Sequence, residues 1–190
     1  MRFKPPLRQG GVDALCGPYS VVNAFRYLCG YDDEACKAIM RSVLAQCGEL
    51  VSSSYGVGMD DGEMSRVIAA ACETHPQSPW KVSWDRTHVL VDTAEKFMRR
   101  LYAADAVTES GDDVGDVRVA HILGLDGLLP HWTVVRKATP VSLHVYDSTG
   151  LTRLDRDDLA VVGERRSVFN LNGRQVFRVT ATRVAPSNPH

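Results

Sequence analysis

The sequence predicts an α+β fold, because helical patterns fill its first half and strand patterns its second. Apolar residues recur at helical spacing up to about residue 104, whereas from about residue 117 they form short runs bounded by turn residues. The chain has 190 residues, of which 44% are hydrophobic, enough for one domain with its own core. We therefore expect a single domain over residues 1–190, with two lobes and N-terminal helices packed on an antiparallel sheet.

Helices are expected over residues 16–29, 33–46, 60 or 61 to 73, and 92–104. Gly30 and Gly48 follow the first two patterns and are typical of residues that end a helix. Asp32 precedes the second pattern as a helix cap, and Asp92 with Glu95 resembles a capping box at the start of the last one.

Strands are expected at Val117–Leu125, His131–Lys137, Val141–Tyr146, Val168–Leu171 and Arg174–Val184. Asp126-Gly127 indicates a turn after the first of these strands. Asn172-Gly173 is a strong hairpin signal, because the turn that it favours has positive φ at both central residues. Residues 185–190 are expected to fray.

The charge balance excludes several classes of partner. The formal net charge is −1, with 22 basic and 23 acidic residues, which gives no basis for binding nucleic acid or an anionic membrane surface. No apolar run reaches the length of a membrane span, and no apolar segment follows the basic start of the chain as in a signal peptide. A cytoplasmic location is expected, and the oligomeric state stays open.

The cysteines predict neither a disulfide framework nor a metal site. There are five, at positions 16, 29, 36, 47 and 72. Their number is odd, their spacing is irregular, and none forms a Cys-x-x-Cys pair. We expect no metal and no cofactor, and we interpret four of the five cysteines as small buried hydrophobic residues.

Cys16 differs from the other cysteines because it opens a helix. In Cys16-Gly17-Pro18, proline suits the first helical turn, where a missing N–H is not needed. The unpaired N–H groups and the positive dipole end at such a position favour a thiolate nucleophile. Gly17 is expected to leave room for a substrate carbonyl. The alternative is a buried structural cysteine at a helix start.

Gln9 lies shortly before Cys16, in a glycine-rich stretch. Its side-chain amide could donate to a developing oxyanion together with the backbone N–H of Cys16. The alternative is an ordinary polar loop residue.

His131 and Asp147 are expected to be neighbours. His131 starts one predicted strand and Asp147 follows the end of the next, and a short antiparallel hairpin brings these two ends together. A carboxylate there would orient the imidazole and set its tautomer. The alternative is a half-buried histidine beside an aspartate that starts a turn. Trp132 is expected to be a core aromatic residue rather than a wall beside His131.

Gln9, Cys16-Gly17-Pro18, His131-Trp132 and Asp147 follow one another in the order found in papain-like cysteine peptidases, which the chain resembles in layout. Cys-Gly-Pro at a helix start looks most like the bacterial double-glycine leader peptidases, the bacteriocin-processing type, and their soluble relatives. The resemblance implies a papain-like fold and catalytic roles for Cys16, His131, Asp147 and Gln9. Gln9 lies one residue further from the cysteine than in the common pattern, and Gly10-Gly11 could absorb that residue.

A weaker resemblance links the segment His131–Lys137 to the histidine strand of Josephin-type deubiquitinases. Those enzymes usually carry Asn where Asp147 stands here, and they lack the Cys-Gly-Pro start. This similarity leaves a ubiquitin-like partner open as one kind of protein substrate.

The constellation predicts a cysteine peptidase that cleaves a peptide or isopeptide bond through a Cys16 acyl-enzyme. An acyltransferase, transglutaminase-like enzyme or deamidase would use the same triad, because these activities differ only in what binds beside the cysteine. A non-catalytic binding module with this fold is the third hypothesis. Residues 49–59, expected to form a loop, and the acidic segment 109–116 are candidates for lining a cleft, with simple connectors as the alternative.

Overall fold

The structure is a computed structural model that describes residues 4–9, 15–53, 58–75, 79–109, 117–127, 130–161 and 168–184. Its helices are α1 (Cys16–Cys29), α2 (Asp33–Ser53), α3 (Asp61–Thr74), α4 (Ala94–Glu109) and the short 3-10 helix η1 (Arg156–Asp158). Its strands are β1 (Trp80–Arg86), β2 (Val117–Gly127), β3 (His131–Ala138), β4 (Ser142–Val145), β5 (Arg153–Asp155), β6 (Leu159–Val161) and β7 (Phe169–Arg183). None of these helices is long and apolar enough to cross a membrane.

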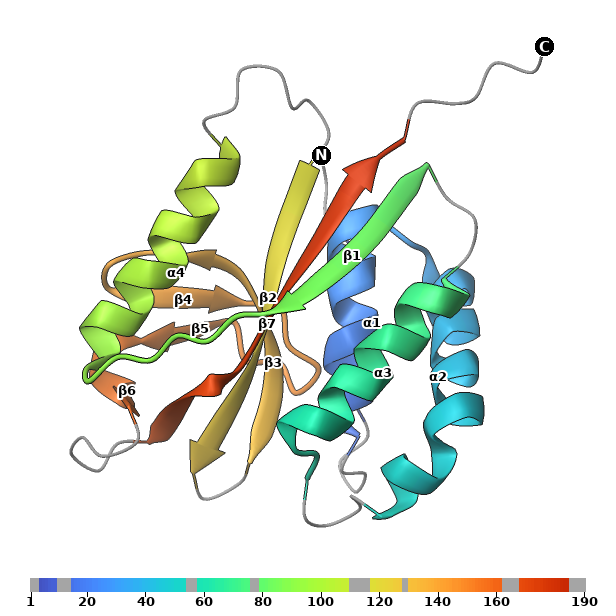
Figure 1. Cartoon of the computed structure of the whole chain (residues 1–190), viewed down its shortest axis with the longest axis horizontal. Coiled ribbons are helices and arrows are strands. Elements are labelled where there is room, and N and C mark those ends of the chain that lie inside the picture. The colour runs from blue at the N-terminus through green and yellow to red at the C-terminus, as the bar shows by residue number, and fades with distance from the viewer. Residues whose placement is uncertain are drawn as a thin grey trace.

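The strands form a single sheet in the order β1-β7-β2-β3-β4-β5 (Figure 1). Strands β2 to β4 form the expected antiparallel meander, and β5, which was not predicted, extends it. The last strand, β7, departs from it by lying between β1 and β2, and the short β6 pairs with β7 in parallel. The predicted α+β class is confirmed, whereas the prediction of a purely antiparallel sheet is wrong at β6.

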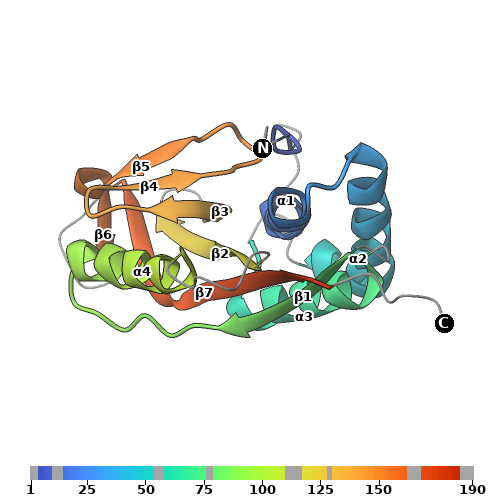
Figure 2. The same cartoon turned by 90° about the horizontal axis from the view of Figure 1, so that it is seen from above.

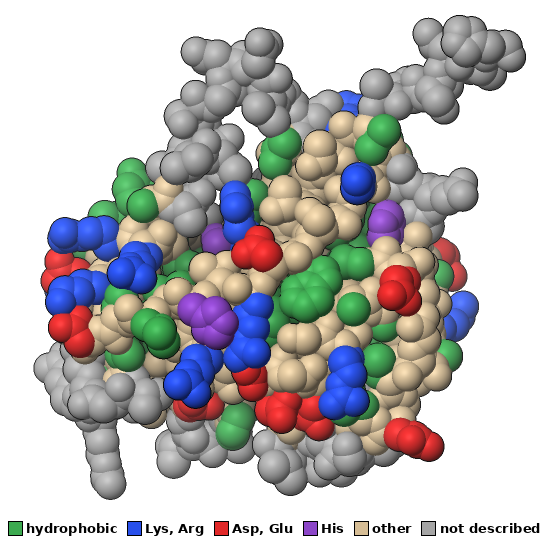
Figure 3. Space-filling view, in the orientation of Figure 1, with side chains coloured by type: hydrophobic (Ala, Val, Ile, Leu, Met, Phe, Trp, Pro, Cys, Tyr) green, Lys and Arg blue, Asp and Glu red, His purple; other side chains and the backbone are tan. Residues whose placement is uncertain are grey.

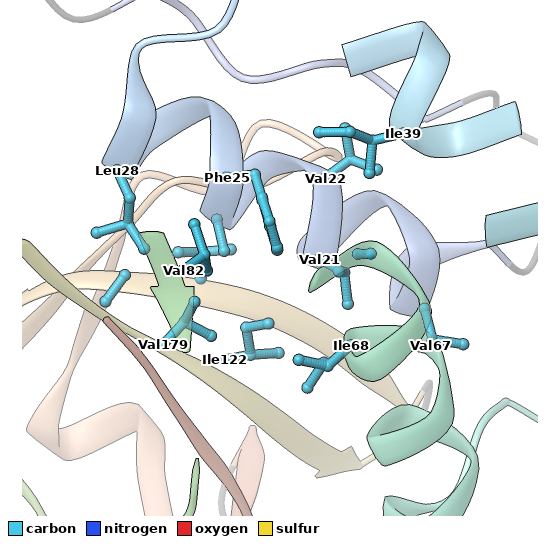
Figure 4. Packing of buried hydrophobic residues seen from close by; sticks show 14 of the residues in the cluster. Val21, Val22, Phe25, Leu28, Ile39, Val67, Ile68, Val82, Ile122 and Val179 are labelled. Atoms are coloured by element: carbon cyan, nitrogen blue, oxygen red, sulfur yellow. The ribbon is translucent and has the colours of Figure 1, made fainter. Parts of the chain in front are cut away.

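Helices cover the sheet on both faces, which creates two apolar clusters. Helices α1, α2 and α3 gather on one side, and α4 lies apart from them along β2 and β3 (Figures 1 and 2). Because side chains alternate along a strand, Ile122 of β2 packs with α1 and α3, while Leu123 packs with α4. Phe25 and Leu28 of α1 point into the first cluster (Figure 4). Charged side chains of both signs are interspersed on the face shown in Figure 3.

Helix α1 has the predicted bounds, but α2 is longer than predicted. Gly30 ends α1 in the left-handed conformation, with φ of 73°, and its N–H donates to the Arg26 carbonyl. Gly48 has no positive φ, so α2 continues through it to Ser53, with a kink at Cys47. Glycine ends a helix when its backbone turns left-handed, and not merely by its presence. The predicted loop is therefore wrong for residues 49–53, and residues 54–57 lie outside the described part of the chain.

The starts of the later helices are set by different caps. Asp60 caps α3 and forms a capping box with Glu63, as its position indicates. The predicted box of Asp92 and Glu95 is wrong, because α4 begins at Ala94 and the Lys96 N–H donates to the Thr93 hydroxyl. Asp92 instead pairs with the Lys96 ammonium at 2.7 Å. Helix α4 also runs to Glu109, beyond the predicted end, and residues 110–116 lie outside the described ranges.

Strand β1, which pairs along its whole length with β7, was not predicted. Its burial alternates, with Trp80 and Val82 buried and Lys81 and Ser83 exposed. That alternation is the signal that could have identified it, since tryptophan and valine favour strands.

Asn172-Gly173 does not form the predicted hairpin, because β7 passes through it without a break. Gly173 has no positive φ, and the Asn172 carboxamide accepts a hydrogen bond from the Arg174 N–H. The Val89 N–H donates to the Gly173 carbonyl at 2.9 Å, and a Cβ on Gly173 would collide with the Val89 carbonyl oxygen. The glycine is thus needed for close approach of two backbones and not for a turn. Asp126-Gly127 likewise lies within β2.

Gly173→Ala should lower the free energy of unfolding by about 1–3 kcal/mol, because overpacking against backbone cannot be relieved by a side-chain rotation. Gly48→Ala is the matched control, since no atom lies within 4 Å of its added Cβ and alanine favours a helix. Urea denaturation followed by circular dichroism measures both. Equal stabilities of the two variants would contradict the close-approach explanation.

Candidate active site

Cys16 is the first residue of α1 and is 7% exposed. Leu15 precedes it without a side-chain cap, and the Tyr19 N–H donates to the Leu15 carbonyl at 3.0 Å, so the N–H groups of Cys16 and Gly17 begin the helix beside the thiol-bearing residue. Gly17 was expected to leave room for a substrate carbonyl, but in the structure it allows two methionine side chains to pack against the start of α1. A Cβ there would lie 2.7 Å from the Met59 sulfur and 2.9 Å from the Met64 sulfur.

His131 and Asp147 are in contact, as hairpin geometry predicts. His131 opens β3, Asp147 follows β4, and His131 Nε2 lies 2.7 Å from Asp147 Oδ2. Asp147 is 1% exposed. Nε2 faces the carboxylate, and the Cys16 side chain lies close enough to the His131 ring to contribute to raising its pKa. The structure therefore brings three of the four predicted site residues together.

The electrostatics of this cluster favour a charged imidazole. Burial lowers the pKa of His131, but hydrogen bonds with Asp147 and Cys16 outweigh it and raise the pKa to about 9. Burial raises the pKa of Asp147, but its contact with His131 outweighs that effect and lowers the pKa to about 2, with help from Thr149 and Thr133. An imidazolium beside an ionised carboxylate is the state that these contacts stabilise at neutral pH.

Asp147 is held in place through its second oxygen. The Thr149 N–H donates to Asp147 Oδ1 at 2.8 Å, and the Thr149 hydroxyl donates to the same oxygen at 2.6 Å. With Oδ1 occupied in this way, Oδ2 is directed at His131. Thr149 was not identified from the sequence, although an Asp two residues before a Thr is a common local pairing.

Gln9, the fourth predicted site residue, lies beside the residue that follows Asp147. Its backbone N–H donates to the Ser148 carbonyl at 3.1 Å, and the Ser148 hydroxyl donates to Gln9 Oε1 at 3.2 Å. The structure thus links Gln9 to the turn that carries the carboxylate. Residues 10–14, which connect it to Cys16, lie outside the described ranges.

The segment 58–60 contacts the chain neighbours of Cys16 and His131 and was only partly anticipated. The Trp132 indole N–H donates to the Met59 carbonyl at 3.0 Å, and a Cβ on Gly58 would touch Pro130. Trp132 is buried and packs on Phe177, which confirms it as a core aromatic residue. Met59 therefore belongs to the surroundings of the site, whereas residues 110–116, the bulk of the acidic candidate segment, lie outside the described part.

The remaining cysteines have surroundings that suppress reactivity. Burial raises the pKa of Cys29 to about 12 and that of Cys72 to about 11. Burial also raises the pKa of Cys36 and of Cys47. Within the described ranges, no cluster of His, Cys, Asp and Glu side chains is suited to hold a metal ion.

No protein-family model and no curated protein matches the chain. Among solved structures, the chain is similar to the crystal structure of the Pseudomonas avirulence protein AvrPphB, with 9% sequence identity and a TM-score of 0.34. The similarity covers 88% of this chain and 91% of that chain. A likeness at this level carries no functional inference, so function has to be inferred from the contacts of the site.

Proposed function

We propose that this chain is a papain-like cysteine peptidase of one domain, in which Cys16 cleaves a peptide or isopeptide bond. The observation that carries the proposal is the His131 ring with two neighbours, Asp147 at 2.7 Å from Nε2 and Cys16, both of which raise the pKa of the imidazole. A nucleophile, a base and a group that orients the base are the parts that acyl transfer needs.

Acylation would begin from a thiolate and imidazolium pair. The Cys16 sulfur attacks the amide carbonyl carbon, and the oxyanion that forms accepts hydrogen bonds from the Cys16 N–H and the Gln9 amide. The intermediate then collapses, the C–N bond breaks, and the His131 imidazolium gives its proton to the leaving amine. Asp147 holds the ring in position throughout.

Deacylation would reverse the proton transfers. Neutral His131 takes a proton from water, the hydroxide oxygen attacks the thioester carbonyl, and the Cys16–carbon bond breaks to release a carboxylic acid. An amine in place of water would give the acyl transfer that the same triad supports.

The proposed substrate is a peptide or a protein. Incubation with a peptide library, with Cys16→Ala as the blank, tests cleavage by mass spectrometry. A ubiquitin probe with a C-terminal electrophile tests the ubiquitin-like branch, and an added amine acceptor separates acyl transfer from hydrolysis. Cleavage that persists in the Cys16→Ala protein would refute the proposal.

The His131 ring should keep its proton up to about pH 9, because its pKa is raised from 6.5 by Asp147 and Cys16. The imidazolium is present below this pKa and is lost above it. Since the imidazolium protonates the leaving amine, amide turnover should fall as the pH rises through about 9. Asp147→Asn removes a carboxylate that raises the pKa, and the titration should move to lower pH. Nuclear magnetic resonance of the histidine ring carbons measures both, with His131→Gln assigning the signal among six histidines. An unchanged midpoint in Asp147→Asn would contradict this electrostatic role.

A further inference from the structure

Gln9 lies at the end of residues 4–9, a segment outside the helices and strands that we name the N-terminal strap. The strap is anchored to α1, where the Leu7 N–H donates to Asn23 Oδ1 at 2.8 Å and Asn23 Nδ2 donates back to the Leu7 carbonyl at 3.2 Å. It is also anchored near the end of β4, where the Tyr146 hydroxyl donates to the Lys4 carbonyl at 2.6 Å. Asn23 is completely buried, so this attachment is a fixed part of the fold.

The last residue of the strap is fastened by Ser148. Two hydrogen bonds join them, one between backbones at 3.1 Å and one from the Ser148 hydroxyl to Gln9 Oε1 at 3.2 Å. Since the hydroxyl holds the oxygen of the amide, the NH₂ end is directed away from Ser148. An amide donates to an oxyanion through its NH₂ group. A hydrogen bond that holds the amide oxygen at Ser148 therefore leaves the NH₂ group on the side from which it can donate.

Ser148 also belongs to the turn that holds the carboxylate. It is 3% exposed and lies between Asp147 and Thr149, whose N–H and hydroxyl both donate to Asp147 Oδ1. The neighbouring Gly150 has a φ of 101°, and the Arg8 side chain of the strap occupies the space where a Cβ on Gly150 would lie. One turn thus contacts both the orienting carboxylate and the segment that carries Gln9.

We propose that Ser148 is a positioning residue that orients the Gln9 amide toward the oxyanion of the reaction. The proposal rests on the proposed function of Cys16 and Gln9. It assigns to the residue after Asp147 a role that differs from that of Asp147, because Ser148 acts on the oxyanion side of the reaction and not on the imidazole.

Two reagents separate this role from the nucleophile itself. Acylation of Cys16 by p-nitrophenyl acetate forms an S–C bond and expels p-nitrophenolate through a tetrahedral oxyanion. Alkylation by iodoacetamide forms an S–C bond and expels iodide with no oxyanion. Gln9→Ala should slow acylation about 100-fold and Ser148→Ala about 10-fold, because the latter misplaces the donor without removing it. Both variants should alkylate at the wild-type rate.

The double variant shows whether Ser148 acts through Gln9. In the Gln9→Ala background, Ser148→Ala should cause no further loss of acylation, since a positioning residue has nothing left to position. Ser142→Ala is the matched control, because Ser142 is 2% exposed and bonds to Thr139 in a different turn. It should leave both rates unchanged. Ser148→Thr, which keeps the hydroxyl donor and adds no thiol, should retain more acylation than Ser148→Ala and serves if Ser148→Ala folds poorly.

Multiplicative losses in the double variant, or an equal drop in acylation and alkylation, would overturn the role of Ser148. A different result would overturn the proposed function. If wild-type Cys16 resists both reagents while folded, the nucleophile assignment fails, and if Gln9→Ala acylates normally, the oxyanion assignment fails. Circular dichroism melting of every variant shows that the comparisons are made between folded proteins.

Discussion

Cys16→Ala should abolish both peptide cleavage and the rapid reaction with iodoacetamide at neutral pH. The physical reason is that Cys16 combines a helix N-terminus with a neighbouring imidazole whose pKa is raised to about 9, whereas burial raises the pKa of the other cysteines. Intact-protein mass spectrometry should show one fast modification in the wild-type chain and none in the variant. The fold should persist, because alanine fills most of the volume that the cysteine leaves.

Cys72→Ala is the matched control for this prediction. Among the described cysteines Cys72 alone is partly exposed, and burial still raises its pKa to about 11. Its removal should leave the single fast modification and any cleavage unchanged. If the fast site maps to Cys72, or if Cys16→Ala retains cleavage, the assignment of the nucleophile is wrong.

His131→Ala should slow peptide cleavage by about 10² to 10⁴, the range for removing a general acid and base. Asp147→Asn should be milder, at about 10- to 100-fold, because it removes one charge-assisted hydrogen bond and leaves the ring in place. The loss should appear in kcat more than in KM, since neither side chain is expected to bind the substrate in the ground state.

The measurement is kcat and KM for a cleaved peptide at neutral pH, with Thr149→Val as an intermediate variant. That change removes the 2.6 Å hydroxyl donor to Asp147 and leaves the backbone donor at 2.8 Å, so its effect should be smaller than that of Asp147→Asn. Equal losses in His131→Ala and Asp147→Asn would show that Asp147 does more than orient the ring.

Local patterns predicted the parts of the fold that are held by local interactions. Helix α1 begins at Cys16 and ends before Gly30, because its end depends on a glycine in the left-handed conformation. The contact of His131 with Asp147 could also be predicted, since both flank one short antiparallel connection. The start of α3 after Asp60 belongs to the same group, although its capping box was not predicted.

Patterns failed where a distant segment decides the outcome. Asn172-Gly173 has the composition of a hairpin, but the backbone of residues 87–89 hydrogen-bonds to Gly173 and Val176, and β7 continues through the dipeptide with an irregular register against β2. A glycine next to the thiol, as at Gly17, predicts open space for a substrate, but Met59 and Met64 occupy the space beside it. In both cases the role of a glycine depends on what packs against it, which composition cannot indicate.

By itself the sequence determined the α+β class, the helix start at Cys16 and the pairing of His131 with Asp147, because each follows from hydrogen-bond geometry between near neighbours. Only the tertiary structure decided that the Cys16 helix start lies against His131. It also decided that Met59 lies against Gly17 and Trp132 and that Ser148 hydrogen-bonds to Gln9. These contacts join segments far apart in the chain, and they form only when α1, the strap and the turn after β4 pack against one sheet.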